Sequence, residues 1–207
     1  MRRHVSIHPR GILRQLVERI RGWEQTLVRA GEDLPLVVIS YPRGRRVYAE
    51  ALEAALCQTY PRLSAATRQE YAAELPRLPS LLVALLRGRN ACTCLGHYHR
   101  PGSEGRLARR LGADTGLRVG EIDLAIDAIR RWEPFPLAAL AARPAPADRQ
   151  ELEDFRFHAA LLAVFFHELE HLAFPERAEG LVRRRSTDFY AASLREFSQQ
   201  LGLSYGI

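Results

Sequence analysis

Most apolar residues in this chain recur at the three- and four-residue spacing of amphipathic helices. The longest early example is residues 11–29, where Arg and Glu separate apolar positions such as Leu16, Ile20 and Trp23. The same spacing predicts a series of shorter helices, two of them beginning near the helix-start residues Ser64 and Pro79. These helices are expected at 47–58, 64–75, 79–86, 106–111 and 119–132.

Only residues 34–41 have the composition of a secure strand, because β-branched side chains are frequent there and Pro42 follows. Residues 4–8 alternate between polar and apolar and predict a short strand, and part of residues 92–99 could supply another. So few strands predict a mainly helical fold, in which at most a small β-sheet accompanies the helices (α+β).

Residues 133–148 interrupt the helical pattern with repeated prolines and alanines, a composition typical of a linker. We therefore expect a helical region with a few short strands and a Cys/His loop at 1–132, and a helical segment at 149–207. Within that last segment, apolar side chains cover most of the circumference of the helix predicted at 151–174. Such a helix is expected to be buried on several sides.

Charge gives weak support to a nucleic-acid partner. The 207 residues include 30 basic ones, all Arg, against 24 acidic ones, and the formal net charge is +6. This charge is spread along the chain rather than gathered in one block. The helix predicted at 119–132 also carries Glu121, Asp123 and Asp127 at positions expected to be exposed, which is the wrong sign for a helix that faces phosphates.

The cysteines and the apolar runs bear on the cellular compartment. Cys57, Cys92 and Cys94 do not form a disulfide framework, and their odd number predicts reduced thiols. No apolar run follows the basic N-terminal residues as in a signal peptide. The longest apolar run, at 159–166, is too short to cross a bilayer. We expect a soluble cytoplasmic protein without a membrane partner.

The residues most indicative of chemistry are His167-Glu168-x-x-His171, within the helix predicted at 151–174. Two histidines four residues apart project from one face of a helix and can bind a single Zn²⁺. Glu168 can then act as general base on a metal-activated water. Because the surroundings are apolar, ionisable side chains there are costly unless they are paired or bound to metal.

These residues resemble the active-site helix of zincin-type metallopeptidases, and the resemblance extends over residues 165–194. It implies a zinc-dependent hydrolase that cleaves a peptide or protein, with His167 and His171 as zinc ligands and Glu168 as the catalytic base. The metzincin subclass is excluded, because Phe174 and Arg177 occupy the positions of its Gly and its third His.

The resemblance also implies a third ligand on a later helix. Residues 186–192 are similar to the Ala-Asp-x-Phe/Tyr-Ala-Ala-like run of IrrE/ImmA-type peptidases, although Arg or Ser stands where their Glu is expected. Asp188 is therefore our first choice for the third ligand, and Glu179 is the alternative. A loop histidine, His97 or His99, is a further candidate.

Each carboxylate also has an ordinary structural role to weigh against metal binding. Asp188 would stabilise the dipole of a helix that begins near Ser186. Glu179 would form a surface ion pair with Arg177 or Arg183, which contributes little to stability.

Two other functions remain open from the sequence. Cys92, Cys94, His97 and His99 form a candidate second metal site, and a structural zinc there would suit a regulatory or nucleic-acid-binding protein. Alternatively, the helix could belong to a non-hydrolytic di-iron protein, if a second chain supplied another Glu-x-x-His. Zinc is the expected metal, with iron and manganese not distinguished, and neither the substrate nor the oligomeric state is indicated.

Overall fold

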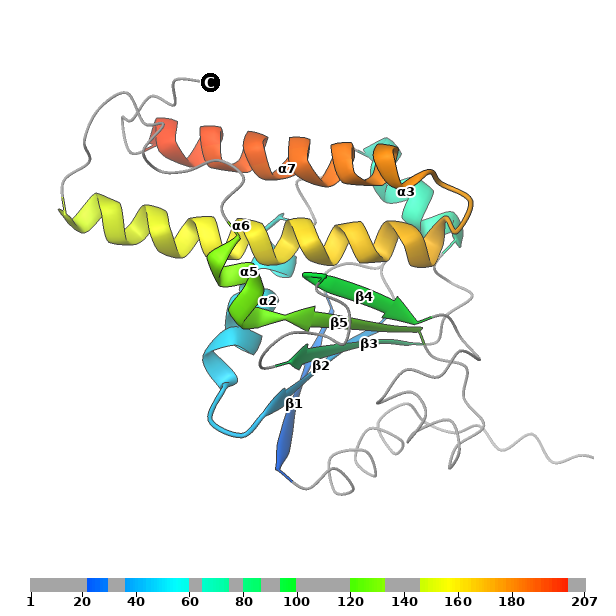
Figure 1. The fold of residues 1–207 in the computed structure, drawn as a ribbon, viewed down its shortest axis with the longest axis horizontal. Helices are drawn as coiled ribbons and strands as arrows, with labels where there is room; N and C mark the ends of the chain where they lie inside the picture. The colour runs from blue at the N-terminus through cyan, green and yellow to red at the C-terminus, as the bar shows by residue number, and fades with distance from the viewer. Residues whose placement is uncertain are drawn as a thin grey trace, which may run out of the picture.

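A five-stranded mixed β-sheet forms the base of the molecule, and helices cover one of its faces (Figure 1). The structure is a computed structural model that describes residues 22–29, 36–59, 65–74, 80–86, 94–99, 120–132 and 146–200. The strands are β1 (Trp23–Val28), β2 (Leu36–Pro42), β3 (Ser80–Leu86), β4 (Gly96–His99) and β5 (Gly120–Ala125). The helices are α2 (Arg46–Thr59), α3 (Ala65–Glu74), α5 (Ile126–Arg131), α6 (Pro146–Ala173) and α7 (Glu179–Gln200).

The strands lie in the order β1-β2-β3-β5-β4. The three central strands β2, β3 and β5 are parallel, and the two outer strands β1 and β4 run antiparallel to their neighbours. β4 thus lies at one end of the sheet, paired with β5 through the register Gly96↔Leu124 to His99↔Glu121.

The expectation of a mainly helical fold with at most a small sheet is wrong, because the sheet has five strands. Part of the error lies at residues 79–86, expected to be helical, which contain β3. All residues from Leu81 to Leu85 are buried, so this strand has no polar side to reveal its two-residue period. A short apolar run of this kind cannot be distinguished from a buried helix by periodicity.

A second misassigned segment is 119–132, which divides into strand β5 and the short helix α5. Glu121 and Asp123 lie on the strand and are 0% and 8% exposed, so the expectation that they are exposed on a helix is also wrong. The alternation of these acids with Ile122 and Leu124 is the two-residue period of a strand.

The N-terminal helix expected at 11–29 is likewise wrong in its described part, because β1 occupies Trp23–Val28. The expected strand at 34–41 is present as β2, and the helices expected at 47–58 and 64–75 are present as α2 and α3. The strand expected at 4–8, the helix expected at 106–111 and most of the linker expected at 133–148 lie outside the described residues.

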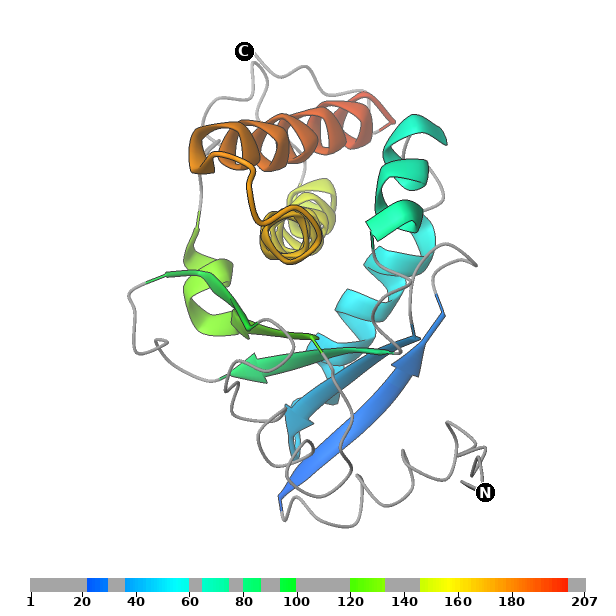
Figure 2. The same ribbon diagram turned by 90° about the vertical axis from the view of Figure 1, so that its right-hand side faces the viewer.

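Helix α6 is the central element of the helical layer. In Figure 2 it is seen nearly end-on, between the sheet on one side and α7 on the other, with α2 and α3 beside it. Every residue from Ala159 to Phe166 is buried, which confirms that this helix is covered on several sides. Its Pro146 occupies the first turn, where the missing N–H costs no helical hydrogen bond.

Within the described part of the chain, no helix has both the length and the apolar character needed to cross a membrane.

Candidate metal centre

The last turns of α6 carry the two histidines of the His-Glu-x-x-His motif. The imidazole rings of His167 and His171 are 4.9 Å apart between centroids and inclined by 74°. Their side chains are only 20% and 14% exposed. The helical spacing therefore places two partly buried rings side by side, as the sequence predicts.

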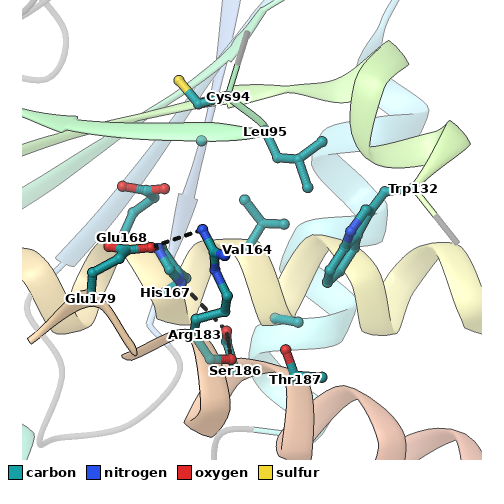
Figure 3. A pocket seen from close by; sticks show the side chains of 12 residues that line it. Cys94, Leu95, Trp132, Val164, His167, Glu168, Glu179, Arg183, Ser186 and Thr187 are labelled. Atoms are coloured by element: carbon teal, nitrogen blue, oxygen red, sulfur yellow. Dashed lines mark hydrogen bonds and ion pairs between the residues drawn. The ribbon is translucent and has the colours of Figure 1, made fainter. Parts of the chain in front are cut away.

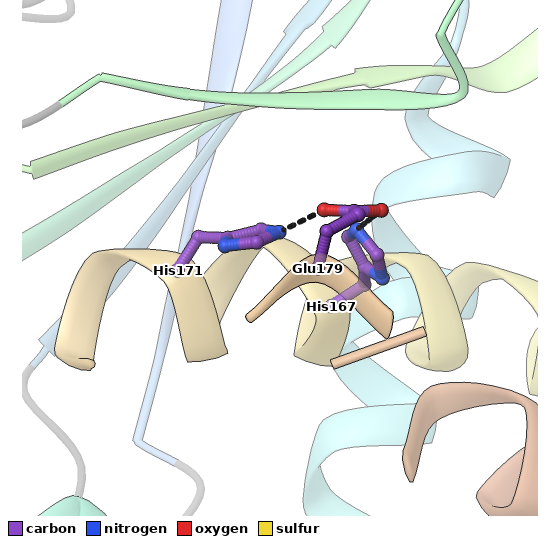
Figure 4. A group of neighbouring side chains, drawn as sticks. All are labelled: His167, His171 and Glu179. Atoms are coloured by element: carbon purple, nitrogen blue, oxygen red, sulfur yellow. Dashed lines mark hydrogen bonds and ion pairs between the residues drawn. The ribbon is translucent and has the colours of Figure 1, made fainter. Parts of the chain in front are cut away.

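A carboxylate from the next helix meets both rings (Figure 4). Glu179 is the first residue of α7, and its Oε2 lies 2.9 Å from His171 Nε2. Its Oε1 lies 3.5 Å from His167 Nε2. Its place in the first turn of α7 also lets the carboxylate interact favourably with the helix dipole.

The three side chains are close enough together to hold one metal ion. One ligand atom from each of His167, His171 and Glu179 lies within 4.8 Å of the others. Ligands that share a tetrahedral zinc with bonds of about 2.0–2.2 Å are separated by roughly 3.3–3.6 Å, so small side-chain adjustments would suffice. Across the described residues, no other group of three His, Cys, Asp or Glu side chains is gathered this closely.

A hydrogen-bond chain behind His167 supports its orientation. His167 Nδ1 is 3.4 Å from Ser186 Oγ, and this hydroxyl donates to the carbonyl oxygen of Arg183 at 2.9 Å. Because the hydroxyl proton is used in that bond, its oxygen is left to accept from Nδ1–H, which leaves the Nε2 lone pair directed toward Glu179. Metal-binding histidines usually have such a partner for their second nitrogen.

The charge state of His167 also suits a ligand. Burial lowers the pKa of His167 below its ordinary value, an effect opposed by the charge of Glu179 and reinforced by His171 and Arg183. A lowered pKa favours the neutral imidazole, which is the form that binds metal.

Glu168 lies beside the histidine pair, on the side of α6 that faces strand β4. Its side chain is buried, and a Cβ placed on Gly96 would lie 2.7 Å from both Cγ and Oε1 of Glu168. Burial, together with the nearby charge of Glu179, raises the pKa of Glu168 from 4.5 to about 7. The absence of a side chain at Gly96 therefore makes room for a carboxyl group in the position expected of a general base.

Strand β4 presents alternate residues to the two faces of the sheet. Gly96 and Tyr98 face α6, and the Tyr98 ring stacks on His171 with a centroid distance of 5.3 Å and an interplanar angle of 16°. His97 and His99 belong to the other face, where His99 Nε2 lies 3.4 Å from Asp123 Oδ2. The strand thus covers the site with a glycine and an aromatic ring, while its histidines point away.

A cavity of about 500 Å³ opens beside His167 (Figure 3). Its walls come from β4 and the residues before it, from α6, from α7 and from the end of α5. The lining residues are Cys94, Leu95, Gly96, Trp132, Ala163, Val164, His167, Glu168, Glu179, Arg183, Ser186 and Thr187. Part of the lining is therefore apolar, and the rest carries His167, Glu168, Glu179, Arg183 and two hydroxyl groups.

The structure places the two candidates for the third ligand on opposite sides of α7. Helix α7 begins at Glu179 rather than near Ser186. Asp188 follows Glu179 by nine residues, or about two and a half turns, so it projects away from α6 and is exposed. The geometry favours Glu179, the alternative of the sequence analysis, over the first choice Asp188. Glu179 also forms the expected ion pair with Arg183, at 3.5 Å.

The candidate second metal site is only partly within the described residues, because Cys92 lies outside them. Cys94 is disulfide-bonded, so the expectation of reduced thiols is wrong at this position, whereas Cys57 is free and exposed. The rings of His97 and His99 are 4.7 Å apart, and His99 is engaged by Asp123. The loop is nevertheless brought next to α6, and residues 94–96 line the same cavity as His167.

Gly96, Tyr98 and Ser186 were missed as site residues by sequence reasoning. In the sequence, Gly96 lies between the potential metal ligands Cys94 and His97, and Tyr98 follows. A glycine inside a strand often marks a close approach of another group. That signal was available only if the segment had been assigned as a strand. The contacts of Ser186 and Tyr98 depend on tertiary packing and leave no trace in the local sequence.

No protein-family model matches the chain, and no significant match is found among curated proteins or solved structures. The case for a function therefore rests on the geometry of the site.

Proposed function

We propose that this protein is a zinc-dependent peptidase whose metal is held by His167, His171 and Glu179. One observation carries the proposal. The Glu179 carboxylate oxygens lie 2.9 Å from Nε2 of His171 and 3.5 Å from Nε2 of His167, beside the buried Glu168. Two imidazoles and one carboxylate are the ligand set of many catalytic zinc sites, which keep a fourth position for water or substrate.

Zinc at this position would polarise a substrate carbonyl and lower the pKa of a water molecule toward 7. Glu168 accepts the proton of the attacking water and passes it to the amine that leaves when the peptide bond breaks. Its place next to Gly96, between the histidine pair and the sheet, supports this role because the carboxyl group lies at the wall of the cavity.

Strand β4 supports an extended peptide as the substrate. It is the last strand in the sheet order of the described residues, and an edge strand of this kind can hold an extended peptide by backbone hydrogen bonds. A peptide added along this edge would lie next to Gly96 and the cavity. The apolar wall formed by Leu95, Trp132 and Val164 would receive a substrate side chain.

A single metal ion fits this arrangement better than a di-iron centre. A di-iron site in a helical bundle needs carboxylates and histidines from several helices around two ions. Within the described residues, the one close ligand group has three members and comes from α6 and α7.

The proposal is tested with zinc-loaded wild type and Glu168→Gln on a degenerate peptide library, with cleavage followed by mass spectrometry. We expect wild type to cleave, and Glu168→Gln to keep its zinc while losing at least about 100-fold in rate, since general-base catalysis contributes roughly 10²–10⁴-fold. Glu176→Gln, at an exposed position in the turn before α7, is the matched control and should cleave like wild type. Zinc-loaded wild type that cleaves no peptide, or a Glu168→Gln variant that cleaves at the rate of wild type, would contradict the proposal.

A further inference from the structure

A second carboxylate of α6, Glu170, lies on the opposite side of the histidine pair from Glu168. Its side chain is only 5% exposed, and such a buried charge needs charged partners. Two arginines supply them. Arg177 contacts Oε2 of Glu170 through Nη1, and Arg185 contacts Oε1 through Nε at 3.1 Å. Each oxygen of the buried carboxylate is therefore bound by a different guanidinium group.

These two arginines flank Glu179 in the sequence. Arg177 belongs to the turn between α6 and α7, two residues before Glu179, and Arg185 lies on α7, six residues after it. The guanidinium of Arg177 also lies 3.6 Å above the ring of Phe174, which begins the same turn. Residues on both sides of Glu179 therefore form ion pairs with the same carboxylate, that of Glu170, which directly precedes His171 in the sequence.

The same arginines are joined from outside by helix α3. Glu70 Oε2 lies 3.3 Å from Nη2 of Arg177 and 3.3 Å from Nη2 of Arg185. Glu70 is 44% exposed, so its contribution is screened by water, whereas that of Glu170 is not. The inner carboxylate is therefore the dominant partner of the pair of arginines.

Apolar packing alone does not fix the beginning of α7. Residues 179–181 are exposed, and Leu181 is 47% exposed, so Val182 is the one buried apolar residue of the first turn that contains Glu179. Burial begins at Val182 and continues at Tyr190 and Leu194 further along the helix. The charged contacts to Glu170 therefore add to the packing of Val182 in holding the preceding turn and α7 against α6.

We propose that Glu170, through Arg177 and Arg185, is a positioning residue for the third metal ligand, an inference that rests on the proposed metal site. Its charge sets where α7 begins relative to α6 and so brings the Glu179 carboxylate to His167 and His171. Glu170 itself touches neither metal nor substrate. Loss of its charge acts on metal affinity through Glu179.

A double-mutant cycle in zinc affinity tests this role, with zinc titrated into metal-free protein against a chelating dye. Glu170→Gln keeps the size of the side chain and removes its charge, and we expect zinc affinity to fall by about 10–100-fold, as for other residues that orient a ligand. In the background of Glu179→Ala, the same substitution should change affinity less than about twofold, because the ligand on which it acts is already gone. Equal losses in both backgrounds, or no loss in either, would overturn the proposal.

Two further variants separate positioning from general stability. Glu70→Gln is the matched control on the exposed side of the same arginines, and its zinc affinity should stay within about threefold of wild type. If Glu170→Gln fails to fold, Arg177→Gln takes its place. It removes the ion pair between the turn and Glu170, and we expect it to lower zinc affinity by the same factor. Because the readout is zinc binding, a wild type that binds zinc but cleaves no peptide would remove the proposed peptidase activity and leave this inference standing.

Discussion

His167 shows how individual atoms define the site. One ring nitrogen, Nδ1, is directed to the Ser186 hydroxyl, and the other, Nε2, faces the Glu179 carboxylate. Close by, Gly96 matters through the side chain that it lacks, because Glu168 occupies the space in which a Cβ would lie. The geometry around the two histidines and Glu168 thus involves the Ser186 hydroxyl and the missing side chain of Gly96, and neither residue is part of the His-Glu-x-x-His pattern.

Gly96→Ala should damage hydrolysis more than metal binding. The new Cβ would lie 2.7 Å from Cγ of Glu168 and 2.9 Å from Cγ1 of Val164, so either the strand or the Glu168 side chain must move. Overpacking of this kind costs about 1–3 kcal/mol. We expect cleavage to fall by at least about tenfold while zinc affinity stays within about threefold, measured by peptide hydrolysis and dye competition.

Gly180→Ala is the control for that substitution, because a Cβ at Gly180 meets nothing within 4 Å on helix α7. Alanine in place of glycine stabilises an exposed helix position by up to about 1 kcal/mol, so activity should be kept and stability should not fall. If Gly96→Ala cleaves peptide at the rate of wild type, Glu168 can accommodate the added methyl group. That result would contradict the proposed role of Gly96.

At the level of elements, the site is made where two helices and an edge strand meet. Helix α6 supplies the histidines and Glu168, α7 supplies Glu179 and Ser186, and β4 closes the side toward the sheet. Glu179, Arg183 and Ser186 lie on one side of α7 because they are separated by about one and two turns. This face of α7 therefore carries the proposed ligand Glu179, its ion-pair partner Arg183 and the hydroxyl group of Ser186 beside His167.

Ser186→Ala tests the contribution of α7 to the orientation of His167. The substitution removes the acceptor for Nδ1–H without adding bulk, and the ring loses its restraint. We expect zinc affinity to fall by about tenfold, at the low end of the usual range because the bond is 3.4 Å long. Thr187→Ser, on the next residue of the helix, is the control and should bind zinc like wild type. An unchanged affinity for Ser186→Ala would remove this hydroxyl from the site.

For the whole molecule, the sheet was the main feature that the sequence did not reveal. The histidine pair, Glu168 and the buried helix around them follow from local spacing, and the secure strand at 34–41 follows from composition. The central strand β3 is buried on both faces and so lacks the pattern of a half-exposed strand, whereas the acids of β5 do alternate with apolar residues but were assigned to a helix. The choice between Glu179 and Asp188 depended on where α7 begins, which is at Glu179 and not near Ser186.

The stability of the whole molecule should depend on pH through His158 on α6. Burial lowers the pKa of His158 below 6.5, and the charge of Asp154 only partly opposes this. The unfolded chain therefore takes up a proton more readily than the folded one. The stabilisation is present above pH 6.5 and is lost as the pH falls through the lower value of the folded state.

This pH effect is measured by urea unfolding of wild type and His158→Gln at pH 8 and pH 5.5. The free energy of unfolding should decrease more on acidification for wild type than for the variant, since the other acids and bases of the chain are shared and cancel in the comparison. Parallel decreases would show that His158 does not distinguish the folded from the unfolded state.

The central claim is that His167, His171 and Glu179 together hold one zinc ion, and calorimetric titration of zinc into the metal-free chain tests it most directly. Wild type should bind one zinc per chain, His171→Ala and Glu179→Ala should each lose at least about 100-fold in affinity, and Asp188→Ala should bind as wild type does. A wild type that binds no zinc would contradict the account. So would a Glu179→Ala variant that keeps full affinity while Asp188→Ala loses it.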